Sequence, residues 1–245
     1  MEHSEKSAVP ELSVVILCYQ AGESVKQFVE RVQSLFKREG IINYELILVS
    51  NYFSDNHDPT PLVVKEIAAN YDNIRYVAKE KQGMMGWDMK SGLSLAQGKY
   101  ISVIDGDGQV LVEDLVKVYR KIISSDADLV KTYRFKRGDS IWRKMLSVFY
   151  NFIFNCLFFT FTFKDVNSKP KVFSRSAYQR LKLSSDDWFI DAEIMIQAKR
   201  LGFKIVEIPT VFLGLTGRRS FVGFKAIWEF IKNLIIYRLK ETFNK

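Results

Sequence analysis

The 245-residue sequence contains only two cysteines, Cys18 and Cys156, which lie far apart and outside any Cys-x-x-Cys or Cys/His cluster. This spacing excludes a readable disulfide framework or zinc site and favours a reducing, cytosolic setting. The first 11 residues form a polar tail without the basic start and apolar run of a signal peptide, so we expect the chain to stay where it is made. Internal repeats, low-complexity tracts and obvious linkers are also missing, and the length fits one large domain with a short appendage.

Positive charge and aromatic side chains are what the sequence has in excess. The formal net charge is +8, the sequence pI is about 9.3, and aromatic residues make up 14% of the chain. Such a charge suits an anionic partner, such as a phosphorylated metabolite, an anionic lipid surface or nucleic acid. We do not expect nucleic acid, because no recognisable binding module is present and the aromatic residues cluster in one apolar run without interleaved cations.

Strand and helix patterns alternate along the first half of the chain. The expected elements are a strand at 12–18, a helix at 23–38, a strand at 44–50, a helix at 61–71, a strand at 74–78, a helix at 83–96, a strand at 100–104, a helix at 111–124 and a strand at 128–133. This order predicts an α/β fold with a mostly parallel sheet covered by helices on both faces. In such sheets ligands bind at the carboxyl ends of the strands.

Residues 145–163 form an almost unbroken apolar and aromatic stretch with basic residues at both ends. Its length approaches that of a membrane span, but Asn151 and Asn155 interrupt it, and dense aromatic rings favour the bilayer interface. We expect an interfacial or partly embedded helix; a buried core or dimer helix and a true span are the alternatives. Residues 223–245 predict a second amphipathic helix, which either packs on the core or lies on a membrane.

A motif with two carboxylates follows the most apolar strand directly. Asp105-Gly106-Asp107-Gly108-Gln109 begins where the strand at 100–104 ends, so both carboxylates can turn into a cleft at the carboxyl end of the sheet. A hard cation held by one or two carboxylates and by substrate phosphates is typical of Mg²⁺ and Mn²⁺ sites. A calcium-binding EF-hand is excluded, because Gln109 and Val110 occupy positions that need Asp/Asn and Gly.

Four segments together resemble family 2 glycosyltransferases, and within that family the polyprenyl-phosphate sugar synthases. They are SVVILCYQAGES at 13–24, GMMGWDMKSGLSLAQGKYISVIDGDGQ at 83–109, DVNSKPKVFSRSAYQRL at 165–181 and GFKIVEIPTVF at 202–212. The resemblance covers residues 12–222 and implies a GT-A fold, a nucleotide-sugar donor, Mg²⁺ or Mn²⁺ as cofactor, and inversion at the anomeric carbon.

The same resemblance implies roles for individual residues. Donor contacts are implied for Leu17, Tyr19, Ser50, Asp88, Lys90, Asp105 and Gly106, and metal ligation for Asp105, Asp107 and Gln109. Phosphate or acceptor contacts are implied for Arg134, Arg143, Lys171, Arg218, Arg219 and Ser220.

The sequence departs from the family pattern at three places. Ser50 stands where the family has an aspartate that contacts the nucleobase, which leaves the base unidentified. The segment 168–171 reads Ser-Lys-Pro-Lys where the family has Ser-Gly-Phe-Arg, so that a cation is retained at Lys171. In the later basic loop Leu215 and Phe221 replace an arginine and a lysine, and Arg218 and its neighbour Arg219 could compensate.

The acceptor determines whether the site needs a general base. A sugar hydroxyl must lose a proton before it attacks, and Asp191 or Glu193 lies where hydroxyl-directed members carry their catalytic acid. A polyprenyl phosphate is already ionised and needs no base. The aromatic stretch at 145–163 and the positive charge favour this lipid acceptor, with the enzyme peripherally bound to the cytoplasmic face of a membrane.

Two other functions remain open. One is a glycosyltransferase that acts on a glycan hydroxyl in lipopolysaccharide, capsule or another cell-surface polysaccharide. The second is a catalytically silent membrane-surface scaffold, which the intact Asp105, Asp107 and Gln109 disfavour. A homo-oligomer or a membrane-protein partner is compatible with either.

Overall fold

The computed structural model describes residues 9–54, 57–138, 141–160, 163–213, 229 and 232–239, with only the backbone of residues 137 and 141–143. The strands are β1 (Leu12–Leu17), β2 (Tyr44–Val49), β3 (Ile74–Val77), β4 (Tyr100–Asp105), β5 (Leu129–Arg137), β6 (Lys171–Ser174) and β7 (Ile205–Phe212). The helices are α1 (Ser24–Arg38), α2 (Thr60–Ala69), α3 (Met85–Leu93), α4 (Glu113–Ser125), α5 (Ile141–Phe158), α6 (Arg175–Arg180) and α7 (Ile190–Arg200).

The strands form one seven-stranded sheet in the order β3-β2-β1-β4-β6-β5-β7. Strands β3, β2, β1 and β4 pair in parallel, and β7 pairs in parallel with β5. Only β6 runs in the opposite direction, antiparallel to both β4 and β5. The predicted α/β class with a mostly parallel sheet is therefore confirmed, while the reversed strand β6 was not predicted.

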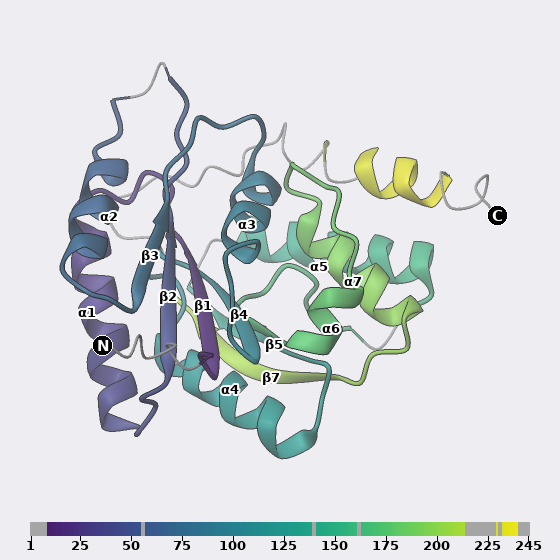
Figure 1. The fold of residues 1–245 in the computed structure, drawn as a ribbon. Coiled ribbons are helices and arrows are strands. Elements are labelled where there is room, and N and C mark those ends of the chain that lie inside the picture. Colours follow the sequence, from purple (N-terminus) through teal and green to yellow (C-terminus); the bar gives the residue numbers. More distant parts are fainter. Residues whose placement is uncertain are drawn as a thin grey trace.

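Helices cover both faces of the sheet (Figure 1). Every residue of β1 is buried, because a central parallel strand has no face in contact with water. Its alternate side chains enter two separate cores. Val15 belongs to the core under α3, α5 and α7, and Val14 belongs to the core under α1, α2 and α4.

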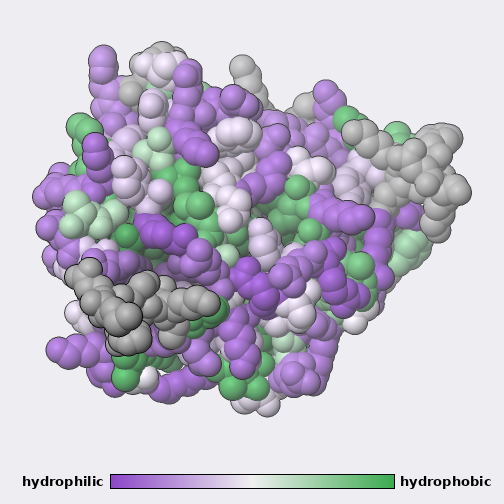
Figure 2. Space-filling model, in the orientation of Figure 1, coloured by the Kyte–Doolittle hydropathy of each residue, from purple (hydrophilic) through white to green (hydrophobic). Residues whose placement is uncertain are grey.

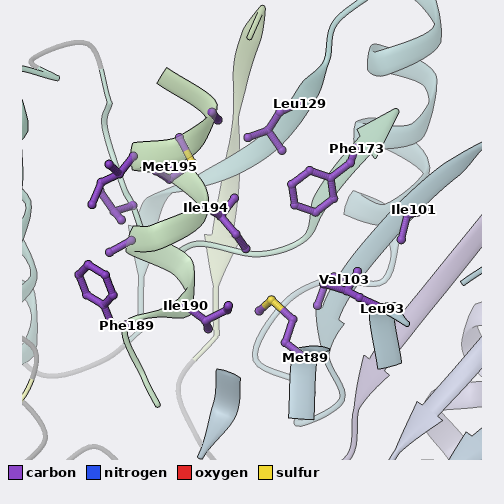
Figure 3. Packing of buried hydrophobic residues seen from close by; sticks show 14 of the residues in the cluster. Met89, Leu93, Ile101, Val103, Leu129, Phe173, Phe189, Ile190, Ile194 and Met195 are labelled. Carbon is purple, nitrogen blue, oxygen red and sulfur yellow. The ribbon is translucent and has the colours of Figure 1, made fainter. Parts of the chain in front are cut away.

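The core under α3, α5 and α7 joins the two halves of the sheet. Figure 3 shows side chains of α3, β4, β5, β6 and α7 directed toward one another, among them Met89, Val103, Leu129, Phe173 and Ile194. The described face of the molecule in Figure 2 is mostly hydrophilic, with smaller apolar areas between the polar side chains.

The aromatic stretch forms helix α5, and it has two different faces. Tyr150, Phe154 and Phe158, spaced four residues apart, are buried in the core under α3, α5 and α7. Phe149 and Phe152 are exposed. The inner face of α5 therefore packs in the core, as expected for the alternative of a buried core helix. The outer face leaves apolar side chains exposed, as contact with a bilayer interface requires.

Two further observations bear on membrane contact. Within the described ranges, no helix is both long enough and apolar enough to cross a bilayer. Residues 232–239 of the predicted C-terminal helix are helical, with Leu234 buried and the ring of Tyr237 packed against Phe158 and Phe189. The remainder of that predicted helix lies outside the described residues.

Candidate active site

The candidate site lies at the edge of the sheet where β1 to β4 end. Leu17, the last residue of β1, stands between Val49 of β2 and Asp105 of β4 in the parallel register. The amide of Gly106 donates to the carbonyl of Leu17 at 2.9 Å. A side chain at Gly106 would lie tightly against Ile16 and that same carbonyl, so glycine suits a turn this close to β1.

The turn after β4 presents the two carboxylates of the predicted metal motif. Asp105 is partly exposed and Asp107 is exposed, and an oxygen of Asp107 accepts the amide of Gln109 at 3.0 Å. Gln109 is fixed to the end of β7 by two bonds: its carbonyl accepts the amide of Leu213 at 2.8 Å, and its side-chain nitrogen donates to the Leu213 carbonyl at 3.3 Å. The motif at 105–109 is thus bonded directly to Leu213, which follows β7.

This donor set fits a divalent ion that shares its coordination with a substrate. Within the described part of the chain, no three His, Cys, Asp or Glu side chains come together to enclose a metal. Asp105 and Asp107 would therefore supply only part of a coordination shell. Two carboxylates completed by phosphate oxygens and water are the usual arrangement for Mg²⁺, and Mn²⁺ accepts the same ligands.

A chain of buried charges leads inward from Asp105. Because β6 runs opposite to β4, the residues just before β6 arrive at the edge where β4 ends, and Lys169 reaches Asp105. The Lys169 ammonium lies 3.3 Å from an Asp105 oxygen and 3.1 Å from an Asp191 oxygen. The Lys171 ammonium lies 2.6 Å from the other Asp191 oxygen. The order is Asp105, Lys169, Asp191, Lys171, and the last three are buried.

These contacts shift the pKa of each inner group. Burial alone would raise the pKa of Asp191, but Lys169 and Lys171 hold it below its ordinary value. Burial lowers the pKa of Lys171 to about 8, although Asp191 opposes the shift. Burial would also lower the pKa of Lys169, but Asp105 and Asp191 raise it above its ordinary value. Lys171, predicted to contact phosphate, is fully buried, and among the described residues Asp191 connects its ammonium to Lys169 and the site edge.

The second predicted catalytic carboxylate, Glu193, holds a loop. It is buried near the start of α7 and accepts the amide and hydroxyl of Ser184 and the amide of Ser185, at 2.7 to 3.1 Å. The same loop binds the start of α3, where Gly86 donates to the carbonyl of Asp187 at 2.9 Å. In this arrangement Glu193 positions the segment that covers α3.

Two of the predicted donor residues, Asp88 and Tyr19, belong to a second polar cluster beyond β2 and β3. Asp88 is buried on α3, where it accepts the Lys81 ammonium and, at 2.9 Å, the side-chain amide of Asn51. Burial raises the pKa of Asp88, with Lys81 and Asn51 opposing the shift. The Lys81 ammonium also lies 4.1 Å from the centre of the Tyr19 ring. Ser50 is fully buried, and its hydroxyl has no hydrogen-bond partner within the described structure.

Of the remaining predicted cations, Lys90 and Arg134 form ion pairs, and the side chains of the others lie outside the described residues. Lys90 lies 2.7 Å from an oxygen of Asp186. Arg134, near the end of β5, donates through two guanidinium nitrogens to both oxygens of Asp165, at 2.6 and 2.7 Å. Burial would raise the pKa of Asp165, but this guanidinium holds it well below its usual range. The side chain of Arg143 and the residues Arg218, Arg219 and Ser220 lie outside the described residues.

Asn51, Lys81 and Lys169 have no role that the sequence alone predicts. Each belongs to or borders a motif that the sequence already displays, since Lys81 precedes Gly83 by two residues and Lys169 lies in the altered segment 168–171. Lys169 stands where the family pattern has glycine, and this difference is the sequence feature that could have indicated a role for it. A buried lysine is rare unless it is paired, and Lys169 has two carboxylates beside it.

Comparison with known proteins agrees with the paired carboxylates and the α/β sheet in pointing to a glycosyltransferase. Residues 13–184 match the sequence model of glycosyl transferase family 2. The chain therefore belongs to glycosyl transferase family 2.

Similar proteins include two dolichyl-phosphate beta-glucosyltransferases. The one from Saccharomyces cerevisiae is 26% identical over 249 residues, which cover 93% of this chain and 74% of the relative. The one from Trichomonas vaginalis is 22% identical over 243 residues, with the same coverage of 93% and 74%.

A solved structure supports the fold over nearly the whole chain. Glucosyl-3-phosphoglycerate synthase from Mycobacterium tuberculosis, in complex with Mn²⁺, UDP-glucose and phosphoglyceric acid, superposes with a TM-score of 0.71. The match is 15% identical and covers 95% of this chain and 80% of that protein. The predicted GT-A fold is confirmed.

Proposed function

We propose that this enzyme transfers a sugar from a nucleoside diphosphate donor to a polyprenyl phosphate such as dolichyl or undecaprenyl phosphate. Mg²⁺ or Mn²⁺, held by Asp105 and Asp107, is the cofactor. The two similar proteins named as dolichyl-phosphate beta-glucosyltransferases support the lipid acceptor. The similar solved structure with Mn²⁺ and UDP-glucose supports the metal and the class of donor.

The engagement of both candidate bases is the observation that carries this proposal. Asp191 contacts two ammonium groups and its pKa is lowered, while Glu193 accepts hydrogen bonds from three groups, the amide and hydroxyl of Ser184 and the amide of Ser185. A carboxylate in either situation is a poor acceptor for the proton of a sugar hydroxyl. The sequence of residues 214–228 contains no further carboxylate. An acceptor that is already ionised avoids the need for a base.

The reaction is a single displacement. An oxygen of the acceptor phosphate attacks the anomeric carbon, and the bond from that carbon to the nucleoside diphosphate breaks. The bonding electrons leave with the diphosphate oxygen, so the configuration at the anomeric carbon inverts and the enzyme forms no covalent intermediate. When bound, the divalent ion neutralises charge on the leaving diphosphate. Asp105 and Asp107 would hold that ion, while the guanidinium of Arg134 is engaged by Asp165.

A glycan hydroxyl is the second candidate acceptor. It is favoured by the position of Asp191, which a single lysine connects to Asp105. For Asp191 to act as a base in that reaction, Lys169 and Lys171 would have to release it.

The exposed face of α5 supports peripheral contact with the cytoplasmic face of a membrane. Met145, Val148, Phe149 and Phe152 are exposed on it, and the exposed Lys144 lies beside them in the sequence. Apolar rings next to lysine suit the boundary between acyl chains and anionic head groups. This surface would hold the enzyme where a polyprenyl phosphate is dissolved.

Contact with lipid is tested by sedimentation with vesicles that contain anionic lipid. The double variant Phe149→Ser/Phe152→Ser should remain in the supernatant while the unmodified protein sediments. Leu62→Ser removes an exposed apolar side chain from α2 and should sediment normally. Equal sedimentation of the unmodified protein and the double variant would contradict a role for this face.

The activity is tested with a panel of nucleotide sugars, Mn²⁺ or Mg²⁺, and a short polyprenyl phosphate, with nucleotide release measured in parallel without the lipid. Transfer to the lipid phosphate, lost in Asp107→Ala, is the expected result. Donor hydrolysis without lipid transfer would favour the glycan acceptor. If no donor binds, the silent scaffold becomes the better interpretation, and full activity of Asp107→Ala would refute the mechanism.

A further inference from the structure

Lys169 occupies an unusual position for a lysine next to a metal motif. Its side chain is 3% exposed, and its ammonium lies within 3.3 Å of three atoms, namely an Asp105 oxygen, an Asp191 oxygen and the sulfur of Met85. Asp105 itself is 34% exposed, so one side of this carboxylate faces water while the other faces Lys169. A positive charge is therefore built into the protein behind a carboxylate that would also bind a divalent ion.

The charges around the motif determine how well it can attract a cation. Asp105, Asp107 and Asp191 carry three negative charges, and Lys169 and Lys171 carry two positive charges. The net formal charge of these five side chains is therefore −1. A divalent ion alone would leave this cluster positive and would stand close to the Lys169 ammonium in a partly buried setting, where charges interact more strongly than in water. A nucleoside diphosphate brings enough negative charge to reverse that balance.

We infer that Lys169 is a positioning residue that prevents stable metal binding at Asp105 until a nucleoside diphosphate is present. Metal and nucleotide then load together, because each supplies the charge that the other needs. The linkage is reciprocal, so the factor by which nucleotide raises metal affinity equals the factor by which metal raises nucleotide affinity. This inference rests on the metal-dependent donor binding of the proposed function and does not depend on the acceptor.

The test is Mn²⁺ binding, measured from the electron paramagnetic resonance signal of free Mn²⁺, with protein alone and with saturating UDP or GDP. In Lys169→Gln, the affinity for Mn²⁺ alone should rise about tenfold or more, because the repelling charge is gone. The gain that nucleotide brings should shrink by the same factor. Lys169→Arg keeps the charge and should behave like the unmodified protein.

The substitution leaves no buried charge without a partner, because Asp191 keeps Lys171 at 2.6 Å and Asp105 keeps its exposed side. Lys169→Met, which fills similar space without charge, is made in parallel. Lys131→Gln is the matched control: that lysine is also fully buried, but its ammonium contacts Glu207 and main-chain carbonyls, so its removal should leave Mn²⁺ affinity unchanged.

A folded Lys169→Gln or Lys169→Met protein with unchanged or weaker affinity for Mn²⁺ alone would overturn the inference. The unmodified protein gives a second test that needs no variant, since Mn²⁺ must bind at least about tenfold more tightly with nucleotide than without it, and equal affinities would also refute the idea. Failure of the proposed function has a different signature. Sugar transfer to polyprenyl phosphate would then be missing, while the coupling between Mn²⁺ and nucleotide would persist.

Discussion

Replacement of Asp191 by asparagine tests the buried charge chain most directly. The Asp191 side chain is 1% exposed and contacts the ammonium groups of Lys169 and Lys171 at 3.1 and 2.6 Å. Asparagine keeps the shape and removes the charge, so among the described residues Lys169 keeps Asp105, while Lys171 keeps the Ser168 carbonyl and loses its carboxylate partner. Removal of one member of a buried ion pair costs about 3–5 kcal/mol. We expect a loss of this size in the free energy of unfolding at pH 7.

The pH dependence of that loss follows from Lys171. Its folded pKa, about 8, lies below the ordinary value, so the stability of the unmodified protein rises as pH increases above 8, where the folded form has lost the proton and the unfolded form still holds it. Without Asp191 the folded pKa falls further, and this rise begins at lower pH. The difference in stability between Asp191→Asn and the unmodified protein should therefore narrow between pH 6 and pH 8, by up to about 1.4 kcal/mol per pH unit for the proton of Lys171.

Urea unfolding followed by circular dichroism at pH 6, 7 and 8 measures both effects. Asp72→Asn makes the same chemical change at an exposed carboxylate and should alter the free energy of unfolding by less than about 0.5 kcal/mol. A loss below about 1 kcal/mol for Asp191→Asn, or a difference that widens from pH 6 to pH 8, would refute the charge chain as described.

Three further predictions concern the fold around the site. Phe154→Ala removes a fully buried ring from the inner face of α5 and should cost about 3–5 kcal/mol in urea unfolding, and a loss under about 1 kcal/mol would show that α5 is not a core helix. In Gly86→Ala the new methyl group would overlap the carbonyl of Ser185, so we expect a loss of about 1–3 kcal/mol, and a thermal midpoint equal to that of the unmodified protein would contradict this packing. Because the guanidinium of Arg134 lowers the pKa of Asp165, that pair stabilises the protein at pH 7 and loses its effect as pH falls below about 4. Asp165→Asn should be less stable at pH 7 and should lack this part of the acid sensitivity, and identical acid profiles would argue against the pair.

Local patterns were sufficient for the first half of the fold. Parallel strands such as β1 are buried on both faces, so each appears in the sequence as an uninterrupted apolar run. The pair Asp105 and Asp107 could be located because it follows the apolar β4 without a gap. Parallel strands end at one edge of the sheet, and this geometry brings the motif beside Leu17 of β1.

Helix α5 could be predicted as a helix but not oriented. Its inner residues Tyr150 and Phe154 and its outer residues Phe149 and Phe152 are equally apolar, so the sequence offers no contrast between the two faces. Only packing against the core under α3, α5 and α7 separates them. The membrane interpretation rested on the composition of the whole stretch, which is the same for either orientation.

The charge chain lay beyond sequence reasoning for a different reason. Strand β6 has only four residues, and nothing in its local pattern indicates that it runs antiparallel between β4 and β5. A charged residue such as Lys169 is expected at the surface unless a partner is known. Its partners Asp105 and Asp191 are distant in sequence, and only the sheet topology and the seating of α7 bring them together.

The pairing of β6 with β4 has a consequence for how the chain can change in length. The register that sets Lys171 opposite Val103 fixes Lys169 relative to Asp105 through main-chain hydrogen bonds within the sheet. The segment that carries this lysine is anchored at both ends, by the ion pair of Asp165 with Arg134 and by the pairing of Lys171 in the sheet. An insertion or deletion between Asp165 and Lys171 should therefore move the lysine charge away from the motif, so this segment should not tolerate a change in length.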